Sequence, residues 1–502
     1  MPVYNTPETF LRAAITSVCN QLYDNWELCI TDDASTLPWV PMVLKEMAAL
    51  DPRIKWRRHD VNGHISRASN TSLALADGEF VALLDHDDVL PEHALYVIAV
   101  ELNRHRVADI LYSDEDRLDE EGGRIAPHFK PDWNPELFLG CNLINHLGVY
   151  RRSLLVDIGG FREGFEGSQD YDLALRAINA SRPDKIRHIP TILYHWRKHS
   201  TDSSFSQEQP LKCTDAARRA KADFLAARNE PGEVVENPLV PIFDRVRRQI
   251  PSPQPLVTLI VPTCNRHDLL SPCIDGLLHR TDYAAVEIII IDHASNEPET
   301  LALLARLRHE ARVRIMPYAG PFNYSDMNNK AVQLAQGEIV GFINNDIDVI
   351  EPGWLAEMVS LAVQPVNGAI GAKLIYLNNC VQHAGIVLGM RGFAGHAFRN
   401  FGRDSLGYAS RLALTANVSA VTGACLVVRK SVFREVGGFN ARDLPVAFND
   451  VDLCLKIAAA GYRNVWTPFA LLYHHESESR GFDTDDARRQ HAEREASYMR
   501  LT

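Results

Sequence analysis

Apolar runs that end in polar residues alternate along the chain with segments of helical periodicity. Residues 80–84 form such a run and lead into Asp85, and residues 26–31 lead into Asp32. Short, continuously apolar runs are typical of buried strands in a parallel sheet. Between them, apolar positions three and four residues apart, as in residues 10–18, predict amphipathic helices. This order predicts an α/β fold with a mostly parallel sheet.

The same pattern occurs a second time about 260 residues further along the chain. Residues 32–35 match residues 292–295 at an offset of 260, and residues 76–79 match residues 335–338 at an offset of 259. Other motifs recur in the same order: Gly-Gly-Phe at 159 and 437, Asp-X-Asp-Leu at 170 and 450, and Leu-Tyr-His at 193 and 472. We therefore predict two tandem domains with Rossmann-like sheets, at residues 1–229 and 256–502, joined by a Pro-rich linker at residues 230–255.

The first strand differs between the two copies. In the second copy, the apolar run 256–261 precedes Pro262 and predicts a full buried strand, whereas only Met1 precedes Pro2. Either the start codon is placed too late, or the chain is a fragment of a longer protein, or the first sheet lacks most of one strand. Because this strand is expected to be central, its loss predicts a less stable first domain.

Composition narrows the class of protein. The chain is 46% hydrophobic and 23% charged, with a formal net charge of -12 and a pI near 5.9, which argues against nucleic acid as its main partner. Its nine cysteines form no CxxC pair, so reduced thiols in a cytoplasmic protein are the simplest interpretation. We see neither a signal peptide nor an apolar run of membrane-spanning length, and expect a cytoplasmic protein or one held peripherally at the cytoplasmic membrane face.

The acidic turn after residues 80–84 is a candidate metal site. Two carboxylates one residue apart, Asp85 and Asp87, suit a hard divalent cation that also binds phosphate oxygens. The alternative is a solvated acidic loop, but the second copy repeats the pattern with Asn344 and Asp346. No Gly-rich phosphate loop is found, so we expect a metal to hold the phosphate.

Other acids at strand and helix ends have two interpretations each. Asp32 and Asp33 can accept hydrogen bonds from a nucleotide base and ribose, or can form a turn and cap the next helix. Asp170 at a predicted helix start can serve as a general base or as a cap. His195 is either a ligand or a structural histidine.

Several of these motifs together resemble a known family. Pro-Val-Tyr-Asn, Asp-Asp-Ala-Ser, Asp-His-Asp-Asp, Gly-Gly-Phe and Gln-Asp-Tyr-Asp-Leu in the first copy are similar to those of inverting family-2 glycosyltransferases, which have the GT-A fold. The second copy, with Val-Gln-His-Ala-Gly at 381–385 and Asn-Asp-Val-Asp-Leu at 449–453, resembles the bacterial O-antigen and rhamnan-type surface-polysaccharide branch. The resemblance covers nearly the whole chain and implies two tandem GT-A domains.

The resemblance also implies roles for residues. Asp32, Asp33 and Asp292 would hold the nucleotide; Asp85, Asp87 and Asp346, with His195 and His474 nearby, would bind Mg²⁺ or Mn²⁺ on the diphosphate; Asp170 and Asp450 would be the bases. Asp114, Asp116, Asn344, Asp348 and His383 would lie near the donor or acceptor. The donor would be a UDP-, GDP- or dTDP-linked sugar, and the acceptor a glycan or a lipid-linked glycan.

Three functions remain open at this stage. The chain is a bifunctional glycosyltransferase, or one domain is catalytic and the other a degenerate copy that binds glycan or serves as a scaffold. A nucleotidylyltransferase is the third hypothesis, but it would need a Gly-rich, basic loop that residues 262–268 do not offer. In the second copy, Asn344 stands at the position equivalent to Asp85, and His293 at the position equivalent to Asp33. The second site is therefore expected to be less anionic.

Overall fold

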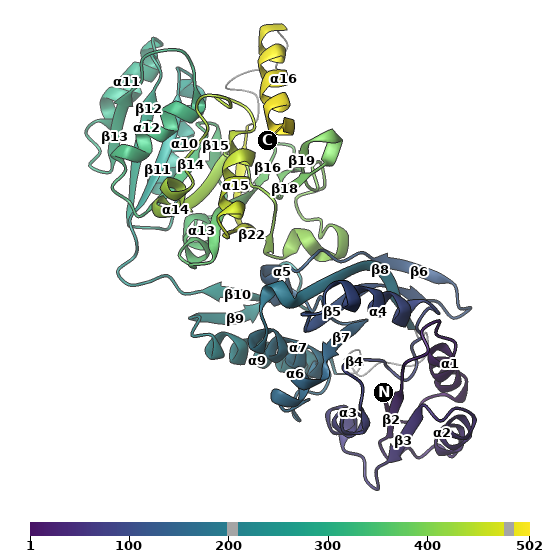
Figure 1. Cartoon of the computed structure of the whole chain (residues 1–502). Helices are drawn as coiled ribbons and strands as arrows, with labels where there is room; N and C mark the ends of the chain where they lie inside the picture. The colour runs from purple at the N-terminus through teal and green to yellow at the C-terminus, as the bar shows by residue number, and fades with distance from the viewer. Residues whose placement is uncertain (198–208, 476–485, 502) are drawn as a thin grey trace. The chain divides into compact units, whose positions relative to one another are not determined.

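Two units make up the chain, Met1–Val246 and Arg247–Thr502, in a computed structural model that describes residues 1–197, 209–475 and 486–501 (Figure 1). Each unit combines parallel strands with helices, so the predicted α/β class is confirmed. The division falls inside the segment predicted as a linker. Part of that segment is structured: β9 (Gly232–Glu236) pairs with β10 (Asp244–Arg248) and packs against α9 (Pro210–Ala227).

The first sheet of unit 1 is small and parallel. It contains β1 (Pro2–Val3), β2 (Leu28–Asp32) and β3 (Ile54–Arg58) in that order. Helices α1 (Glu8–Cys19) and α2 (Trp39–Leu50) pack against each other, and α3 (His64–Leu75) contacts all three strands. The buried side chains of α1 are spaced three and four residues apart, which agrees with the predicted amphipathic helix.

The second sheet of unit 1 has the order β4 (Phe80–Ala82), β7 (Gly148–Arg151), β5 (Ile110–Leu118) and β6 (Arg124–His128), with β8 (Ile186–Arg197) parallel to β5. The remaining helices are α4 (Ala94–Arg104), α5 (Pro135–Gly140), α6 (Arg152–Asp157) and α7 (Gln169–Ala180), with a 3-10 turn η1 at Pro183–Lys185. The turn after β4 and the start of α7 carry the predicted acids Asp85 and Asp170.

Unit 2 contains a sheet of ten strands within its described residues. The main path is β13 (Val313–Pro317), β12 (Val286–Asp292), β11 (Val257–Thr263), β14 (Ile339–Ile343), β21 (Cys425–Arg429), β16 (Asn367–Ile375), β22 (Arg463–His474) and β15 (Ile347–Val349). β17 (Val381–His383) joins β16, β20 (Ala416–Asn417) joins β22, and β18 (Ile386–Leu388) pairs separately with β19 (Ala394–His396). The helices are α10 (His267–His279), α11 (Pro298–Leu307), α12 (Tyr324–Leu334), α13 (Trp354–Ala362), α14 (Lys430–Glu435), α15 (Asn449–Ala459) and α16 (Asp486–Leu501), with 3-10 turns η2 (Met390–Gly392) and η3 (Tyr408–Ala413).

Both faces of the unit 2 sheet are covered, which explains its continuously apolar strands. Successive side chains of a strand point to opposite faces, so Leu259 and Val261 of β11 pack into one core while Ile260 packs into the other. Helices α10, α11 and α13 supply the first core, and α12 and α15 supply the second. A strand buried on both sides has no polar face, as expected for a parallel sheet between helix layers.

The first strands of the two units differ in length, in agreement with the sequence. β1 pairs Val3 with Asp32, and β11 pairs Thr263 with Asp292, so the two strands end in the same register. β11 begins four residues earlier than the position of Met1, and those residues, 257–260, are the ones that pair with β14. Within the described part of unit 1, β4 is instead hydrogen-bonded to β7 alone, and the sheet is split in two.

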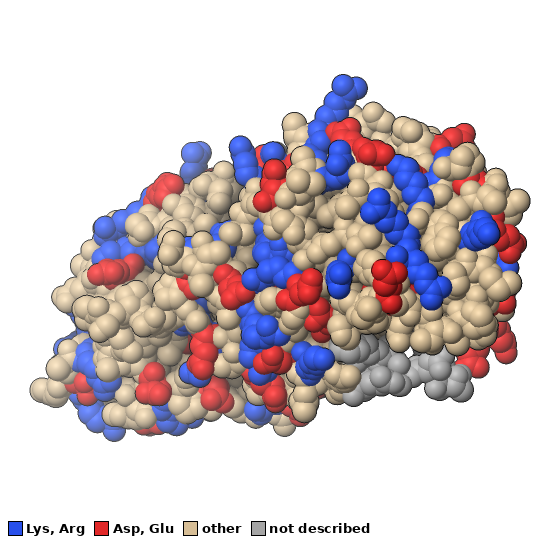
Figure 2. Space-filling view, turned by 90° about the horizontal axis from the view of Figure 1, so that it is seen from below, with Lys and Arg blue, Asp and Glu red and all other residues tan. Residues whose placement is uncertain are grey.

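The surface is mixed in charge on the face that Figure 2 shows, where Lys and Arg lie interspersed with Asp and Glu. This distribution is typical of an ordinary solvated protein surface. Among the described helices, none combines the length and the apolar character that a membrane span requires.

Candidate functional site

Three side chains in unit 1 form a group that can hold a metal ion. Asp85, Asp88 and His146 each offer one ligand atom, and these atoms lie within 4.8 Å of one another. The sequence predicted Asp85 together with Asp87, whereas the structure brings Asp85 together with Asp88 and leaves Asp87 outside this group. Two carboxylates and an imidazole are suitable ligands for a divalent cation.

Asp88 is the buried member of the group. Its carboxylate accepts hydrogen bonds from the Tyr194 hydroxyl at 2.6 Å and from the Arg197 backbone N–H at 2.7 Å. Burial, followed by the charges of Asp85 and Asp87, raises the pKa of Asp88 to about 8. A cation bound between these carboxylates would relieve the repulsion that disfavours the ionised form.

His146 enters the site from the segment that precedes β7. Its Nδ1 lies 2.9 Å from Glu115 Oε2 and its Nε2 lies 3.8 Å from Asp85 Oδ2. The ring stacks on Tyr194 at a centroid distance of 4.9 Å, which fixes its plane. Burial would lower the pKa of His146, but the hydrogen bond and charge of Glu115, with the charge of Asp85, outweigh it and raise the pKa to about 9. Glu115 therefore orients the imidazole so that Nε2 faces Asp85.

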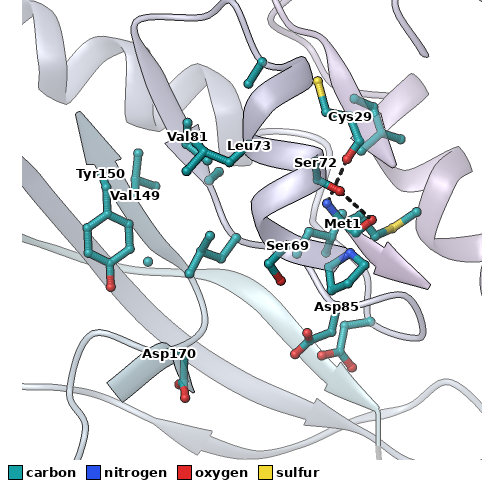
Figure 3. Close-up of a pocket in the computed structure, with 18 of the residues that line it drawn as sticks. Met1, Cys29, Ser69, Ser72, Leu73, Val81, Asp85, Val149, Tyr150 and Asp170 are labelled. Atoms are coloured by element: carbon teal, nitrogen blue, oxygen red, sulfur yellow. Dashed lines mark hydrogen bonds between the residues drawn. The ribbon is translucent and has the colours of Figure 1, made fainter. Parts of the chain in front are cut away.

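Asp170 lies at the second position of α7 and lines the same cavity as Asp85, a space of about 2040 Å³ (Figure 3). The Asn142 side-chain amide donates a hydrogen bond of 3.0 Å to its Oδ2. Burial raises the pKa of Asp170, partly opposed by the positive charge of His146. A carboxylate with a raised pKa is a better proton acceptor than a solvated one, which suits the predicted role of general base.

His195 is held away from the metal-binding group by a neighbouring strand. Its Nδ1 lies 2.5 Å from Asp116 Oδ1, and the Arg124 guanidinium donates to the other oxygen of Asp116 at 2.6 Å. Asp114 accepts hydrogen bonds from the Lys130 backbone N–H and from His188 Nε2, both at 2.8 Å. The cavity is lined by other residues of the described chain, so in this structure His195, Asp114 and Asp116 form internal contacts.

The strand-end acids predicted to bind a nucleotide form turns. Asp32 Oδ1 accepts a hydrogen bond from the Ser35 backbone N–H at 2.9 Å, and Asp292 Oδ1 accepts the equivalent bond from Ser295 at 3.0 Å. Asp33 lies 2.7 Å from His59 Nδ1, accepts from the Gly63 backbone N–H at 2.9 Å, and also lines the cavity. The turn interpretation is therefore observed, and the nucleotide role remains a prediction.

In unit 2 the histidine of the repeated motif does approach the acidic turn. His474 Nε2 lies 3.3 Å from Asp346 Oδ1, and both side chains are buried. The contact follows from strand pairing, because Ile347, next to Asp346, pairs with His474. Within the described residues, the only cluster of three potential ligands is the one in unit 1, so unit 2 contributes a pair.

Asp450 lies at the second position of α15, as Asp170 does in α7. Its Oδ2 accepts a hydrogen bond from the Gly423 backbone N–H at 2.8 Å, and its Oδ1 accepts from the Val451 backbone N–H at 2.8 Å. The Tyr324 hydroxyl donates to the Gly423 carbonyl at 3.1 Å. These contacts fix the carboxylate at the helix N-terminus.

Next to Asp346 and His474, unit 2 holds a pair of histidines. His383 is fully buried, with its Nδ1 2.8 Å from His396 Nδ1 and its Nε2 accepting a bond of 3.4 Å from the Thr422 backbone N–H. Burial, followed by the charges of His396 and His474, lowers the pKa of His383 well below its usual value. His383 is therefore a neutral hydrogen-bonding group beside His474.

The two remaining predicted residues of unit 2 have other contacts. The Asn344 backbone N–H donates to the Ala424 carbonyl at 3.0 Å. Asp348 forms an ion pair of 2.5 Å with Arg280 at the end of α10. Its carboxylate is therefore already neutralised by a guanidinium.

Sequence reasoning missed several residues of the unit 1 site: Asp88, Glu115, Asn142, His146 and Tyr194. Asp88 and Glu115 belong to acidic stretches that the sequence did single out, so a broader choice within those stretches would have found them. Asn142 and His146 lie between α5 and β7, where no motif or periodic pattern marks them.

Comparison with known proteins agrees with this architecture. The model of the Glycosyl transferase family 2 matches residues 1–159 and 258–437, one match in each unit. The chain is 45% identical over 502 residues to the uncharacterized protein y4gI of Sinorhizobium fredii, covering all of this chain and 55% of that protein. It is 40% identical over 483 residues to the O-antigen biosynthesis protein RfbC of Myxococcus xanthus, covering 96% of this chain and 37% of that protein.

The chain thus spans about half, or less, of the length of these relatives. Among solved structures, a mannosyltransferase from Pyrobaculum calidifontis in complex with GDP-Man and Mn²⁺ matches 50% of this chain and 66% of its own, at 21% identity and a TM-score of 0.37. The two family matches fall on the two repeats that the sequence predicted. The chain belongs to glycosyltransferase family 2, with one family domain in each of its tandem units, and is related to O-antigen biosynthesis proteins.

Proposed function

We propose that the chain transfers sugars from nucleotide-diphosphate donors to a glycan or lipid-linked glycan acceptor, with inversion and with Mg²⁺ or Mn²⁺ as cofactor. Family membership and the 40% identity to an O-antigen biosynthesis protein support a role in bacterial cell-surface polysaccharide synthesis. The proposed place of action is the cytoplasm or the cytoplasmic face of the membrane.

The observation that carries the proposal is that the group of Asp85, Asp88 and His146 shares one cavity with Asp170. The donor set fits a divalent cation, and its one nitrogen ligand favours Mn²⁺ over Mg²⁺. When bound, such a cation would neutralise the charge that develops on the leaving diphosphate. Asp85 and Asp88 would hold it, and Glu115 would keep His146 oriented toward it.

The proposed base is Asp170 in unit 1 and Asp450 in unit 2. An acceptor hydroxyl has too high a pKa to ionise beforehand, so a carboxylate must take its proton while the new bond forms. Asn142 positions one oxygen of Asp170, and backbone N–H groups position both oxygens of Asp450. One base in each unit agrees with a single displacement that inverts the anomeric carbon.

For unit 2 we propose a second active site, with Asp346 and His474 as ligands. The alternative is that unit 2 is a degenerate copy that binds glycan or serves as a scaffold. The smaller set of ligands in unit 2 favours the alternative, because Asn344 stands where unit 1 has the carboxylate of Asp85. What favours activity is the contact between His474 and Asp346 and the fixed carboxylate of Asp450.

The test replaces the two bases in the full chain. We would measure transfer and donor hydrolysis with UDP-, GDP- and dTDP-linked sugars, with and without Mn²⁺, for Asp170→Asn, Asp450→Asn and the double variant. If both units are active, each single variant loses one of two products, by about 100-fold or more, and the double variant loses both. Exposed Asp184→Asn and Asp275→Asn serve as matched controls, one in each unit.

Three outcomes would contradict parts of the proposal. If only one single variant has an effect, the other unit is a degenerate copy. If the double variant still transfers sugar at the parental rate, the assignment of both bases is wrong. If Mn²⁺ and Mg²⁺ make no difference to any product, the proposed metal dependence is wrong.

A further inference from the structure

Helix α16 of unit 2 places a buried carboxylate beside α15, the helix that carries Asp450 (Figure 1). Glu495 is only 2% exposed. Its Oε1 accepts a hydrogen bond of 3.0 Å from the Val446 backbone N–H, and its Oε2 accepts one of 2.6 Å from the Ala447 backbone N–H. We call residues 446–448, which directly precede α15, the base turn. Because burying a carboxylate costs free energy unless donors compensate it, Glu495 and the base turn hold each other in place.

The base turn ends in a residue with an unfavourable backbone conformation. Phe448 is the N-cap of α15 and has a φ of 56°, in the left-handed region that large side chains rarely adopt. Its ring packs edge-on against Phe393 at a centroid distance of 4.7 Å, and its carbonyl accepts from the Asp452 backbone N–H at 2.9 Å. Contacts on several sides are needed to keep Phe448 in this conformation, and Glu495 supplies those to the preceding amides.

The base turn determines where the Asp450 carboxylate points, because Asp450 follows Phe448 by two residues. Asn449, which lies between them, donates from its side-chain amide to the Val446 carbonyl at 3.0 Å. One oxygen of Asp450 accepts from the Gly423 backbone N–H at 2.8 Å, which is a contact with a distant segment of the chain. A change of backbone conformation at Phe448 would turn the first residues of α15 and move the carboxylate away from this N–H.

Unit 1 holds the corresponding turn with other groups. Helix α9 packs against α7, whose second residue is Asp170. The Ser168 hydroxyl, at the N-cap of α7, donates to the Cys213 carbonyl of α9 at 2.9 Å. The Arg219 guanidinium of α9 donates to the Gly164 carbonyl at 2.7 Å. In both units, a helix that lies later in the chain therefore fixes the turn before the proposed base.

We propose that Glu495 is a positioning residue for Asp450. By holding the amides of the base turn, it keeps the Asp450 carboxylate oriented toward the acceptor hydroxyl whose proton it takes. Glu495 acts through the backbone of residues 446–449 and not on the substrate. The inference rests on the proposed function for the role of Asp450 as a base, but the placement of Asp450 by Glu495 can be measured without turnover.

The first measurement is hydrogen exchange at the Gly423 amide in the full chain, because this amide donates to Asp450. In Glu495→Ala, the Val446 and Ala447 amides lose their acceptor, so faster exchange at these two residues confirms that the contact is broken. If Glu495 positions Asp450, the Gly423 amide also exchanges faster, by about tenfold. Glu495→Gln keeps one acceptor oxygen for the two amides, so we expect a smaller increase of about threefold.

The second measurement uses steady-state kinetics to separate positioning from folding. With the UDP-, GDP- or dTDP-linked sugar that gives the unit 2 product, Glu495→Ala should lower kcat by about tenfold or more. The KM for the donor should be unchanged, because the donor site keeps its residues while the base is misplaced. The product of unit 1 should form at the parental rate. Each variant is assayed well below its melting transition, so that partial unfolding does not lower kcat.

Glu493→Gln and Tyr498→Phe are matched controls on α16. Glu493 is exposed and lies two residues before Glu495, so Glu493→Gln makes the same chemical change as Glu495→Gln away from the base turn. The Tyr498 hydroxyl accepts a hydrogen bond of 3.1 Å from the Asn440 side chain, so Tyr498→Phe weakens the attachment of α16 at a residue outside the base turn. Both variants should keep the Gly423 exchange rate and the kcat of the parent within about twofold.

Two results would overturn the proposal. The first is unchanged exchange at Gly423 in Glu495→Ala, which would mean that Asp450 keeps its place without Glu495. The second is an equal effect of Glu495→Ala and Tyr498→Phe, which would mean that α16 only stabilises unit 2. If Glu495→Ala does not fold, the comparison of Glu495→Gln with Glu493→Gln decides. A failure of the proposed function looks different, because Asp450→Asn would then leave the unit 2 product unchanged while the Gly423 exchange still tests the positioning.

Discussion

The two units differ in two respects. Unit 2 has the more continuous sheet, whereas unit 1 has the larger group of potential metal ligands. Unit 2 has a continuous sheet around a seven-residue β11, and its acidic turn offers Asp346 with His474. Unit 1 has a two-residue β1 and a split sheet, yet it presents the larger group of ligands. The two units therefore share the α/β fold but differ in the groups that their acidic turns bring together.

The topology explains how the unit 1 site keeps its geometry although the strands of unit 1 form two separate sheets. Asp85 and Asp88 follow β4, Tyr194 belongs to β8, and His146 precedes β7, so all of them are attached to the second sheet. Hydrogen bonds from Tyr194 and Arg197 to Asp88 hold the turn to β8. The first sheet contributes Asp33 to the cavity wall.

The largest effect is expected from removing one ligand in each unit. Asp346→Asn leaves unit 2 with a single proposed ligand, so its metal-dependent transfer should fall by about 100-fold or more. Asp85→Asn leaves Asp88 and His146 in unit 1, so we expect a loss of about tenfold. Titration of Mn²⁺ against transfer for each product measures both values.

The proposed difference between the two metal sites would be wrong if Asp346→Asn and Asp85→Asn lost activity equally. Equal losses would mean that unit 1 does not use the additional ligands that the structure groups together. Arg182→Gln and Arg266→Gln, which break ion pairs with the exposed Asp184 and Asp268, control for general destabilisation in each unit.

A pair of equivalent glycines tests the scaffold. Gly337→Ala would push a Cβ against the backbone of β11, which cannot move easily inside a sheet, so we expect unit 2 to lose about 2–3 kcal/mol of unfolding free energy. Gly78→Ala meets no atom closer than 3.4 Å, so unit 1 should change by less than about 0.5 kcal/mol.

Chemical denaturation followed by hydrogen exchange, which distinguishes the two units, measures this difference. A large loss in Gly78→Ala would mean that other atoms of unit 1 lie closer to this glycine than the structure shows. If Gly337→Ala left the unfolding free energy of unit 2 unchanged, the backbone of β11 would have to lie further from this glycine than the structure shows.

The sequence predicted the repeat and the fold class because each rests on local patterns of apolar residues. It also placed Asp170 and Asp450 at helix starts, where both are found. It predicted the same role for His195 and His474, and the backbone of each pairs next to its acidic turn. Only the His474 ring contacts an acid of that turn, whereas the His195 ring binds Asp116. The reason is the residue on the neighbouring strand. In unit 1, Asp116 of β5 pairs with His195 and also binds its ring. In unit 2, the position next to His474 is taken by Tyr376, which follows β16.

The sequence could not decide between Asp87 and Asp88, because the conformation of a turn determines which carboxylate points inward. It could not find His146 either, since that residue reaches the site through a stretch without periodic pattern. Its place depends on the hydrogen bond to Glu115 and on stacking with Tyr194. Such contacts between distant segments become visible only when the chain is folded.

The smallest effect is expected for Asp348. Its substitution tests how many metal ligands unit 2 supplies. Because Arg280 already neutralises this partly exposed carboxylate, Asp348→Asn should leave the Mn²⁺ affinity of unit 2 unchanged and lower its stability by about 0.5 kcal/mol. Arg280→Gln should cost more stability, since it breaks the same ion pair and also removes hydrogen bonds to the Val349 and Pro272 carbonyls. If Asp348→Asn instead weakened Mn²⁺ binding, the carboxylate would have to leave Arg280 when the metal binds. Unit 2 would then have three ligands, and its chemistry would match that of unit 1 more closely than the ion pair indicates.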